Sequence, residues 1–294
     1  MNSENTINIY DYLVYIIFDN KQLKKFISIL NIIRSYNDNT IIYFNKNDFY
    51  FKNKDRLDIL MYKIILYDIY YYYCKDDFDD FKIAVDLNVL YQAINNLITY
   101  TGMCERKLSL CINKNSKDKL DIIVESCRNS VVSNVTASIN LYDISLIKDI
   151  PPLQIYYNYE IEMKYNLFYD IINKLYKDNN LLNIELDPNK FILTTPKDDY
   201  NIAYEFNNLN INSNNHQKII CVSIDQNYLK NNETFKCNST YDLRHIISLF
   251  NIILVNEVNI DIDNIDIRFD NNKPLYITYD IPQFSKCIFV IASK

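Results

Sequence analysis

The sequence repeats its own pattern of apolar residues at a shift of 142 positions along its 294 residues. With that shift, four apolar residues at helical spacing in the first half align with four in the second half. They are Leu23, Phe26, Ile29 and Ile33, aligned with Tyr165, Phe168, Ile171 and Leu175. The segment 40–51 likewise aligns with 182–193, and both read as two strands around a polar turn. Self-similarity over this distance indicates two copies of one structural unit.

Each copy continues with a second helical segment and further strands. Apolar residues at i, i+3 and i+4 predict helices over 86–101 and 241–256. Asn, Asp and Pro in the segments 45–48 and 187–190 favour turns. Strand-like runs follow both helices, at 107–112, 120–124, 258–269 and 275–279. The sequence therefore predicts an α+β fold of two similar domains, each with two helices packed on antiparallel sheet.

A segment with consecutive prolines separates the two halves. Pro151 and Pro152 forbid a helix and disfavour a central strand. The same segment contains the apolar residues Leu146 and Ile147. Apolar residues are unusual in a connector that is exposed to water on all sides, so we expect this segment to pack on a domain. This predicts an N-terminal domain over 1–140, a connector over 141–156 and a C-terminal domain over 157–294. Each half is long enough to bury its own core.

Composition excludes several classes of enzyme. The single glycine, Gly102, cannot build the glycine-rich loops that surround phosphates in many nucleotide-binding proteins. His216 and His245 lack spaced carboxylates that would complete a metal site, so we expect no metal and no cofactor. The acidic segment 76–80 could bind a cation, but a solvated loop between two strands is the favoured interpretation. No nucleophile lies on a recognisable sharp turn near a histidine, so we expect no catalysis.

Other features concern the compartment. The first eleven residues include Glu4 and Asp11 and lack a basic stretch followed by an apolar run, so no signal peptide is expected. No run of about 18 apolar residues predicts a membrane span. The seven cysteines are odd in number and have no C-x-x-C spacing, which favours reduced, buried thiols in a soluble protein.

The order of elements and six short motifs resemble proliferating cell nuclear antigen, the eukaryotic and archaeal sliding clamp, over about residues 10–294. The motifs resemble the clamp's first pore helix, the strand before its second helix, the end of its connector, its last helix, a proline-initiated strand and its carboxyl-terminal strand. They are Leu23-Lys24-Lys25, Tyr72-Tyr73-Cys74, Ile150-Pro151, Tyr241-Asp-Leu-Arg244, Lys273-Pro-Leu275 with Tyr279, and Ile288-Phe-Val-Ile-Ala-Ser-Lys294.

The resemblance implies a DNA clamp fold and a homotrimeric ring that encircles double-stranded DNA without reading its sequence. It also implies partners, a DNA polymerase and other replication proteins, that dock through a short peptide motif. The implied location is nuclear, or a cytoplasmic replication site for a cytoplasmic DNA virus. The heavy use of Ile and Asn indicates an AT-rich genome, which a viral relative would fit.

The implied DNA-binding residues lie on three helices and are basic. They are Lys21, Lys24 and Lys25 on the first helix, Lys174 and Lys177 on the third, and Arg244 on the fourth. Basic side chains in a pore would hold phosphates by salt-sensitive attraction. For each lysine the alternative is an ordinary solvated helix face. Four uncharged or acidic residues stand where the family usually has basic ones, which predicts a less basic pore. They are Gln92, Asn95, Asp170 and Asn173.

The implied partner pocket lies beneath the connector and is apolar. Its residues are Ile59, Met61, Ile150, Pro151, Pro274, Val290, Ile291 and Ala292. A few buried anchors dominate such contacts, whereas the alternative for any one of these residues is a place in the core. Subunit contact in the family pairs edge strands, which the resemblance places at 120–126 and 199–206.

Two other functions stay open at this point. A clamp-fold transcription or scaffold factor would keep the partner pocket without forming a ring, and a neutral pore face or a monomer would favour it. A nucleic-acid-modifying enzyme would need a metal or nucleophile constellation that the sequence does not show.

Overall fold

The computed structural model describes residues 9–55, 57–75, 81–101, 105–128, 131–146, 155–196, 200–207, 209, 220–225, 235–250 and 262–294. Two helices and nine strands are described in the first half, with a short 3-10 turn before the first strand and after the last. They are η1 (Ile9–Asp11), β1 (Tyr12–Phe18), α1 (Asn20–Tyr36), β2 (Asn39–Phe44), β3 (Phe49–Lys54), β4 (Leu60–Leu66), β5 (Tyr71–Cys74), β6 (Phe81–Asp86), α2 (Leu87–Thr101), β7 (Glu105–Asn113), β8 (Ser116–Arg128), β9 (Val131–Asn140) and η2 (Ile144–Leu146).

The described part of the second half also has two helices and nine strands. They are β10 (Tyr159–Lys164), α3 (Tyr165–Tyr176), β11 (Leu181–Leu186), β12 (Lys190–Pro196), β13 (Asn201–Asn207), β14 (Ile220–Ile224), β15 (Cys237–Asp242), α5 (Leu243–Phe250), β16 (Asn264–Phe269), β17 (Leu275–Ile281) and β18 (Ser285–Ile291). The helix expected over 241–256 is described only as α5, because 251–261 lie outside the described residues.

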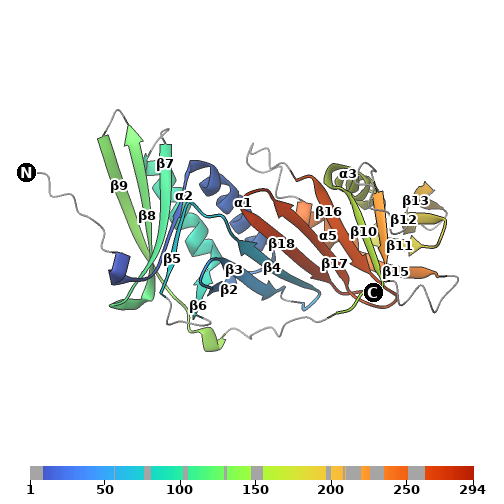
Figure 1. Cartoon of the computed structure of the whole chain (residues 1–294), viewed down its shortest axis with the longest axis horizontal. Coiled ribbons are helices and arrows are strands. Elements are labelled where there is room, and N and C mark those ends of the chain that lie inside the picture. Colours follow the sequence, from blue (N-terminus) through green and yellow to red (C-terminus); the bar gives the residue numbers. More distant parts are fainter. Residues whose placement is uncertain are drawn as a thin grey trace, which may run out of the picture.

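The described strands form three antiparallel sheets, so the predicted α+β class is confirmed. Their strand orders are β5-β1-β7-β8-β9, β14-β10-β16-β17-β18-β4-β3-β2-β6 and β13-β12-β11-β15. The nine-stranded sheet runs across the middle of the molecule and takes strands from both halves, which meet where β4 lies beside β18 (Figure 1). Neighbouring strands in all three sheets pair antiparallel.

The sheet topology contains the predicted repeat. The group β6-β2-β3-β4 has the same order as β15-β11-β12-β13, and β5-β1-β7-β8-β9 has the same order as β14-β10-β16-β17-β18. The two hairpin turns also match, since the Asn45 N–H donates to the Asp48 carbonyl at 2.9 Å and the Asp187 N–H donates to the Lys190 carbonyl at 3.0 Å. The motif Tyr72-Tyr73-Cys74 was expected in the strand just before the second helix. It lies in β5 instead, and β6 follows β5 before α2 begins.

Helix α1 begins where Asp19 caps it. The Asp19 carboxylate accepts hydrogen bonds from the backbone N–H of Lys21 at 2.9 Å and of Gln22 at 2.8 Å, which satisfies two donors that lack partners inside the helix. The apolar stripe that the sequence predicts is buried, with Phe26 and Ile33 fully inaccessible. Burial of this stripe, rather than helix propensity, holds the helix on the sheet.

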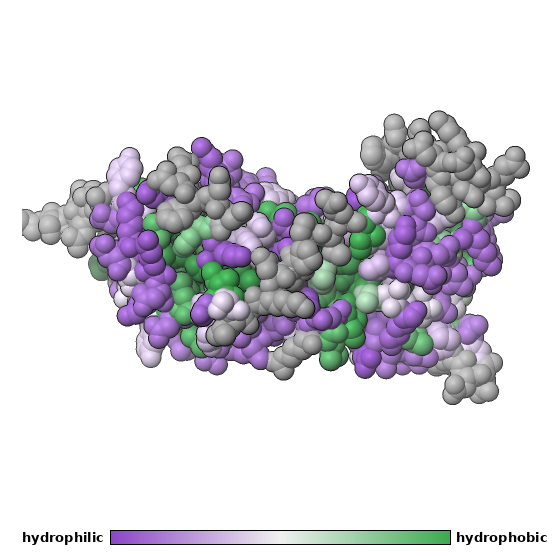
Figure 2. Space-filling view, turned by 90° about the horizontal axis from the view of Figure 1, so that it is seen from below, coloured by the Kyte–Doolittle hydropathy of each residue, from purple (hydrophilic) through white to green (hydrophobic). Residues whose placement is uncertain are grey.

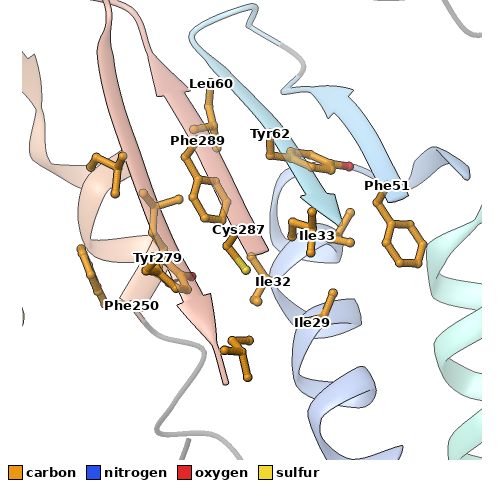
Figure 3. Close-up of a cluster of buried hydrophobic side chains, with 14 of the residues drawn as sticks. Ile29, Ile32, Ile33, Phe51, Leu60, Tyr62, Phe250, Tyr279, Cys287 and Phe289 are labelled. Atoms are coloured by element: carbon orange, nitrogen blue, oxygen red, sulfur yellow. Dashed lines mark hydrogen bonds between the residues drawn. The ribbon is translucent and has the colours of Figure 1, made fainter. Parts of the chain in front are cut away.

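The two halves share one core at the joint between β4 and β18. Leu60 and Tyr62 from β4 are buried in one cluster with Phe289 from β18, and Figure 3 shows Tyr62 close to Ile33 of α1. Helices from the two halves are also linked, because the Tyr36 hydroxyl lies 2.6 Å from the Ser248 hydroxyl. The halves therefore form one continuous hydrophobic cluster.

The cysteines only partly follow the expectation of burial. Cys111, Cys237 and Cys287 are buried, and burial raises the pKa of each thiol to about 12. These three thiols stay protonated and unreactive at neutral pH. Cys127 is exposed, so the expectation was wrong for this residue, which sits near the end of β8. No helix among the described residues is long and apolar enough to cross a membrane.

Two carboxylates face each other across the second-half part of the nine-stranded sheet. Asp266 of β16 lies directly opposite Glu162 of β10. Burial, together with the negative charges of Glu160 and Glu162, raises the pKa of Asp266 to about 6. Because the folded chain holds this proton more tightly than the unfolded chain does, Asp266 lowers stability as the pH rises from about 4 to above 6.

Replacing Asp266 with Asn is therefore expected to stabilise the protein at pH 7, by about 2 kcal/mol in the free energy of unfolding. The neutral amide removes the repulsion and cannot ionise. Urea unfolding of both proteins at pH 4 and pH 7 checks this, and the gain should vanish near pH 4. An equal gain at both pH values would mean that Asp266 does not titrate as its surroundings indicate.

Candidate nucleic-acid face and edge strands

The four described helices lie next to one another in the order α2-α1-α5-α3, since α1 contacts both α2 and α5, and α5 contacts α3. They contain six basic residues and one acidic residue, Asp170. The helices thus have a net charge of +5, whereas the chain as a whole has −6, which leaves −11 for the rest. Positive charge is concentrated on the helical side of an acidic protein, as electrostatic steering of a polyanion requires.

Lys21 and Lys24 extend from the first turns of α1. Both side chains are exposed, and among the described residues neither ammonium group has a carboxylate within ion-pair distance. Lys21 lines an open groove together with Arg106 and Lys107 of β7, next to Glu105 and Glu125. These two lysines are the predicted DNA contacts whose charges are most available to a ligand.

Lys25 is placed differently, although it follows Lys24 directly. Its Nζ donates a hydrogen bond to the Pro282 carbonyl at 2.9 Å and lies 5.8 Å from the centre of the Phe284 ring. Pro282 and Phe284 belong to the turn between β17 and β18, so this lysine links the helix of one half to a turn of the other. Sequence spacing gives no sign of a contact between residues 257 positions apart.

Arg244 is held by a buried carboxylate at the start of α5. Both oxygens of Asp242 accept from the Arg244 guanidinium, at 3.0 Å from Nε and 2.6 Å from Nη2. Lys294 Nζ lies 2.9 Å from the same carboxylate, whose side chain is only 2% exposed. These two cations keep the pKa of Asp242 well below its usual range. Arg244 remains exposed, but Asp242 offsets its charge.

The remaining helix positions are less basic, as expected. Lys174 and Lys177 are exposed at the carboxyl end of α3. The negative end of the helix dipole stabilises positive charges there whether or not they bind a ligand. Asp170 is exposed one turn before Lys174. Helix α2 has no charged residue, and Gln92 is exposed on it. The positive charge of the helical side therefore comes chiefly from α1.

The expected partner pocket divides between surface and core. Ile59, Met61, Pro274 and Ala292 are partly exposed, Val290 is 7% exposed, and Ile291 is fully buried, so for Ile291 the core interpretation is correct. Ile150 and Pro151 lie outside the described residues. Val290 and Ile291 differ because successive side chains of β18 point to opposite faces of the sheet. Ile291 points toward the helices, and Val290 points to the outer face.

Val290 and Met61 stand directly opposite each other on that outer face, and Tyr276 stands opposite Val290 on its other side. The alternation of 275–281 could have revealed Tyr276 as part of this surface. Figure 2 shows two groups of hydrophobic side chains on the face seen from below. Apolar surface of this kind is available for contact with another protein.

The two expected edge strands meet different outcomes. Segment 199–206 corresponds to β13, which has β12 as its one neighbour among the described strands. Segment 120–126 lies in β8, an interior strand between β7 and β9, so that expectation is wrong. Among the described strands the edge of this sheet is β9, which begins with the exposed Val131 and Val132. An exposed edge of ten residues offers unpaired backbone groups to another strand.

Among the described residues, no group of three or more His, Cys, Asp or Glu side chains could hold a metal ion. The site thus consists of a basic helical side, an outer apolar surface and two open sheet edges.

No protein-family model matches the sequence, and no relative is found among curated proteins. Solved structures do match. PCNA from Thermococcus kodakaraensis is similar with a TM-score of 0.71 and 14% identity, covering 96% of this chain and 100% of that one. PCNA from Entamoeba histolytica is similar with a TM-score of 0.70 and 13% identity, covering 96% and 99%. The order of sheets, the internal repeat and these likenesses lead to one conclusion: the chain has the clamp fold of PCNA.

Proposed function

We propose that this protein is a sliding clamp of DNA replication, a homotrimeric ring that encircles duplex DNA and tethers a polymerase and other replication proteins. It acts as a scaffold rather than an enzyme, and its place of action is the site of replication. The observation that supports this best is that the strand pair joining the two halves has an unpaired counterpart in the internal repeat. Strands β4 and β18 pair within the chain, and their counterparts in the other half, β13 and β9, do not pair with each other.

The counterpart relation is visible in the register. Phe51 of β3 lies opposite Ile64 of β4, and Leu193, its repeat partner in β12, lies opposite Tyr204 of β13. Joining β13 of one copy to β9 of the next would thus reproduce the joint that already exists inside each chain. A head-to-tail contact of this kind gives a closed ring when its rotation closes.

The side chains on both edges fit this joint. On β13 the residues facing the helices are Ile202, Tyr204 and Phe206, which are half-buried against the core. On β9 the corresponding row includes Val135 and Ala137, also half-buried against the core. Pairing the two edges would complete the burial of both rows and satisfy the open backbone groups.

The helical side supports the DNA part of the proposal. A ring needs no tight contact to stay on DNA, because the link is topological, and its phosphate contacts need only be electrostatic. The +5 charge of the helices supplies such attraction. The uncharged α2 and the paired Arg244 keep it modest, which suits movement along the duplex.

Two measurements test the proposal. Light scattering over a concentration series should give about three times the chain mass of 35.1 kDa. Protein loaded on a nicked circular plasmid should then resist a high-salt wash and be lost once the plasmid is cut. A trimer that leaves circular and linear DNA equally would contradict encirclement.

The uncharged face of α2 favours one alternative, a clamp-fold transcription or scaffold factor that does not encircle DNA. A monomer across the whole concentration series, together with binding of replication or transcription proteins, would establish that alternative instead.

Replacing Lys21 and Lys24 together with Ala is expected to reduce the slope of log K against log salt for duplex binding by about two or more. Both charges are exposed and unpaired among the described residues. Filter binding on a plasmid at several salt concentrations measures this. The matched control is Lys25→Ala, which should leave the slope nearly unchanged and lower the melting temperature, because its ammonium bonds to Pro282. If Lys25→Ala lowers the slope as much, Lys25 leaves that contact to bind DNA.

A further inference from the structure

The carboxylate of Asp242 holds two positive charges that come from different parts of the chain. One is the guanidinium of Arg244, in the first turn of α5, which donates two hydrogen bonds to it. The other is the ammonium of Lys294, which lies 2.9 Å from the carboxylate and belongs to the segment after β18. Asp242 therefore connects the basic helical side with the segment that follows the last strand.

The segment after β18, residues 292–294, is fixed to β15 by its backbone. The Lys294 N–H donates to the Thr240 carbonyl at 2.9 Å, and Ser293 forms an isolated antiparallel bridge with Tyr241. Figure 1 shows this end of the chain, marked C, close to β15. Because β15 leads directly into α5, the segment 292–294 lies next to the start of that helix.

Asp242 needs at least one of the two cations, because its side chain is only 2% exposed. A carboxylate that is buried without a cation is strongly unfavourable. Hydrogen bonds from Arg244 and Lys294 keep the pKa of Asp242 well below its usual range, so it is ionised at neutral pH. The side chains of Arg244 and Lys294 are 59% and 46% exposed, so either can turn toward another anion while the other stays.

A phosphate group of duplex DNA would compete with Asp242 for Arg244. A guanidinium binds a phosphate and a carboxylate in the same way, through two parallel N–H bonds. When a phosphate draws Arg244 away, Asp242 is left with Lys294 as its cation and holds it more strongly. When Lys294 is drawn away instead, Asp242 holds Arg244 more strongly, and less of the positive charge of Arg244 reaches DNA.

We propose that Asp242 couples the contact between Arg244 and DNA to the segment 292–294, so that DNA tightens the hold on Lys294 and loss of Lys294 weakens DNA binding. This rests on the proposed DNA binding of the helical side. Asp242 is a positioning residue, since it touches no phosphate itself. The coupling is reciprocal, so an anionic group of a partner that takes Lys294 would loosen the grip on the duplex.

Asp242→Asn removes the shared charge and keeps the helix cap. An Asn side chain caps a helix about as well as Asp, but a neutral amide holds neither cation. Filter binding to a short duplex should show a slope of log K against log salt that is steeper by about one, and binding about 5- to 10-fold tighter near 0.1 M salt. A merely structural role for Asp242 would weaken DNA binding, and that result would overturn the proposal.

Lys294→Ala separates the coupling from a direct contact with DNA. It should weaken duplex binding by about 2- to 5-fold in the unmodified protein and have no effect in Asp242→Asn, because Lys294 acts through that carboxylate. The matched control is Lys21→Ala on α1, which should weaken binding by the same factor in both backgrounds. If Lys294→Ala also acts equally in both, Lys294 binds DNA itself and the proposal is wrong.

Hydrogen exchange of the Lys294 amide, followed by NMR, reports how firmly the segment 292–294 is held and needs no ring. Arg244→Ala should slow this exchange without DNA. Duplex DNA should slow it in the unmodified protein but not in Asp242→Asn, and unchanged exchange in Arg244→Ala would overturn the proposal. A monomer whose exchange responds to duplex keeps this inference and loses the ring. A trimer retained on circular DNA without that response keeps the clamp and loses this inference.

Discussion

Replacing Tyr204 with Asp is expected to leave the protein as single chains of 35.1 kDa at concentrations where the proposed ring would form from the unmodified protein. Tyr204 is in the middle of the apolar row of β13, where the joint with β9 of the next copy would bury it. A carboxylate there would lose its water without gaining a cation. Burying an unpaired charge costs about 3 to 5 kcal/mol, which weakens each contact by a factor of about 200 to 5,000.

Glu205 supplies the matched control for this variant. It neighbours Tyr204 on the same strand, but its side chain is exposed on the opposite face. Glu205→Gln should keep the trimer, and light scattering of both variants beside the unmodified protein distinguishes the two faces. If Tyr204→Asp stays trimeric, the chains do not associate through β13. If both variants become monomeric, the strand as a whole matters rather than its apolar row.

Replacing Phe289 with Ala is expected to lower the free energy of unfolding by about 3 to 5 kcal/mol. Phe289 is fully buried where β18 meets β4, with its ring 5.8 Å from that of Tyr279 and directly opposite Tyr62. The neighbouring strands belong to both halves and cannot close over the cavity. Because one core spans the joint, we expect the whole chain to unfold in one transition at a lower denaturant concentration.

Ile288→Ala is the control for Phe289→Ala. Ile288 precedes Phe289 on β18 and lies on the outer face, where it is only half-buried. Its loss should cost about 1 kcal/mol, since less apolar surface is uncovered. Urea unfolding followed by circular dichroism measures both. Two separate transitions in the unmodified protein would show that the halves are independent, contrary to the shared core.

Local patterns predicted most of the individual elements correctly. The apolar stripe of α1 and the polar turns of both hairpins are visible within a few residues of sequence, because helix and turn signals are local. The repeat then gave the second half from the first. The expected division at 140 and 157 remains a prediction, since the nine-stranded sheet contains strands from both sides of it.

Long-range contacts were the part that the sequence could not supply. The bond between Lys25 and the Pro282 carbonyl joins segments with no shared local signal. The resemblance alone placed segment 120–126 at an edge, and its alternating burial is equally typical of an interior strand with one polar face. The true edge, β9, consists largely of small and polar residues with weak periodicity. The sequence could have revealed Asp242 as a helix cap, since Asp just before a helix commonly has that role. Its carboxylate accepts a hydrogen bond from the backbone N–H of Arg244 at 3.0 Å.

The continuous sheet between the halves also has a mechanical consequence. Within a chain, the joint of β4 and β18 is reinforced by a filled core, by the hydroxyl pair of Tyr36 and Ser248 and by the ammonium of Lys25. Between chains, only strand edges and two half-buried rows would be in contact. Each chain would thus act as a stiff arc. A ring under strain would open at the interfaces between chains, and each chain would stay folded and able to close the ring again around the duplex.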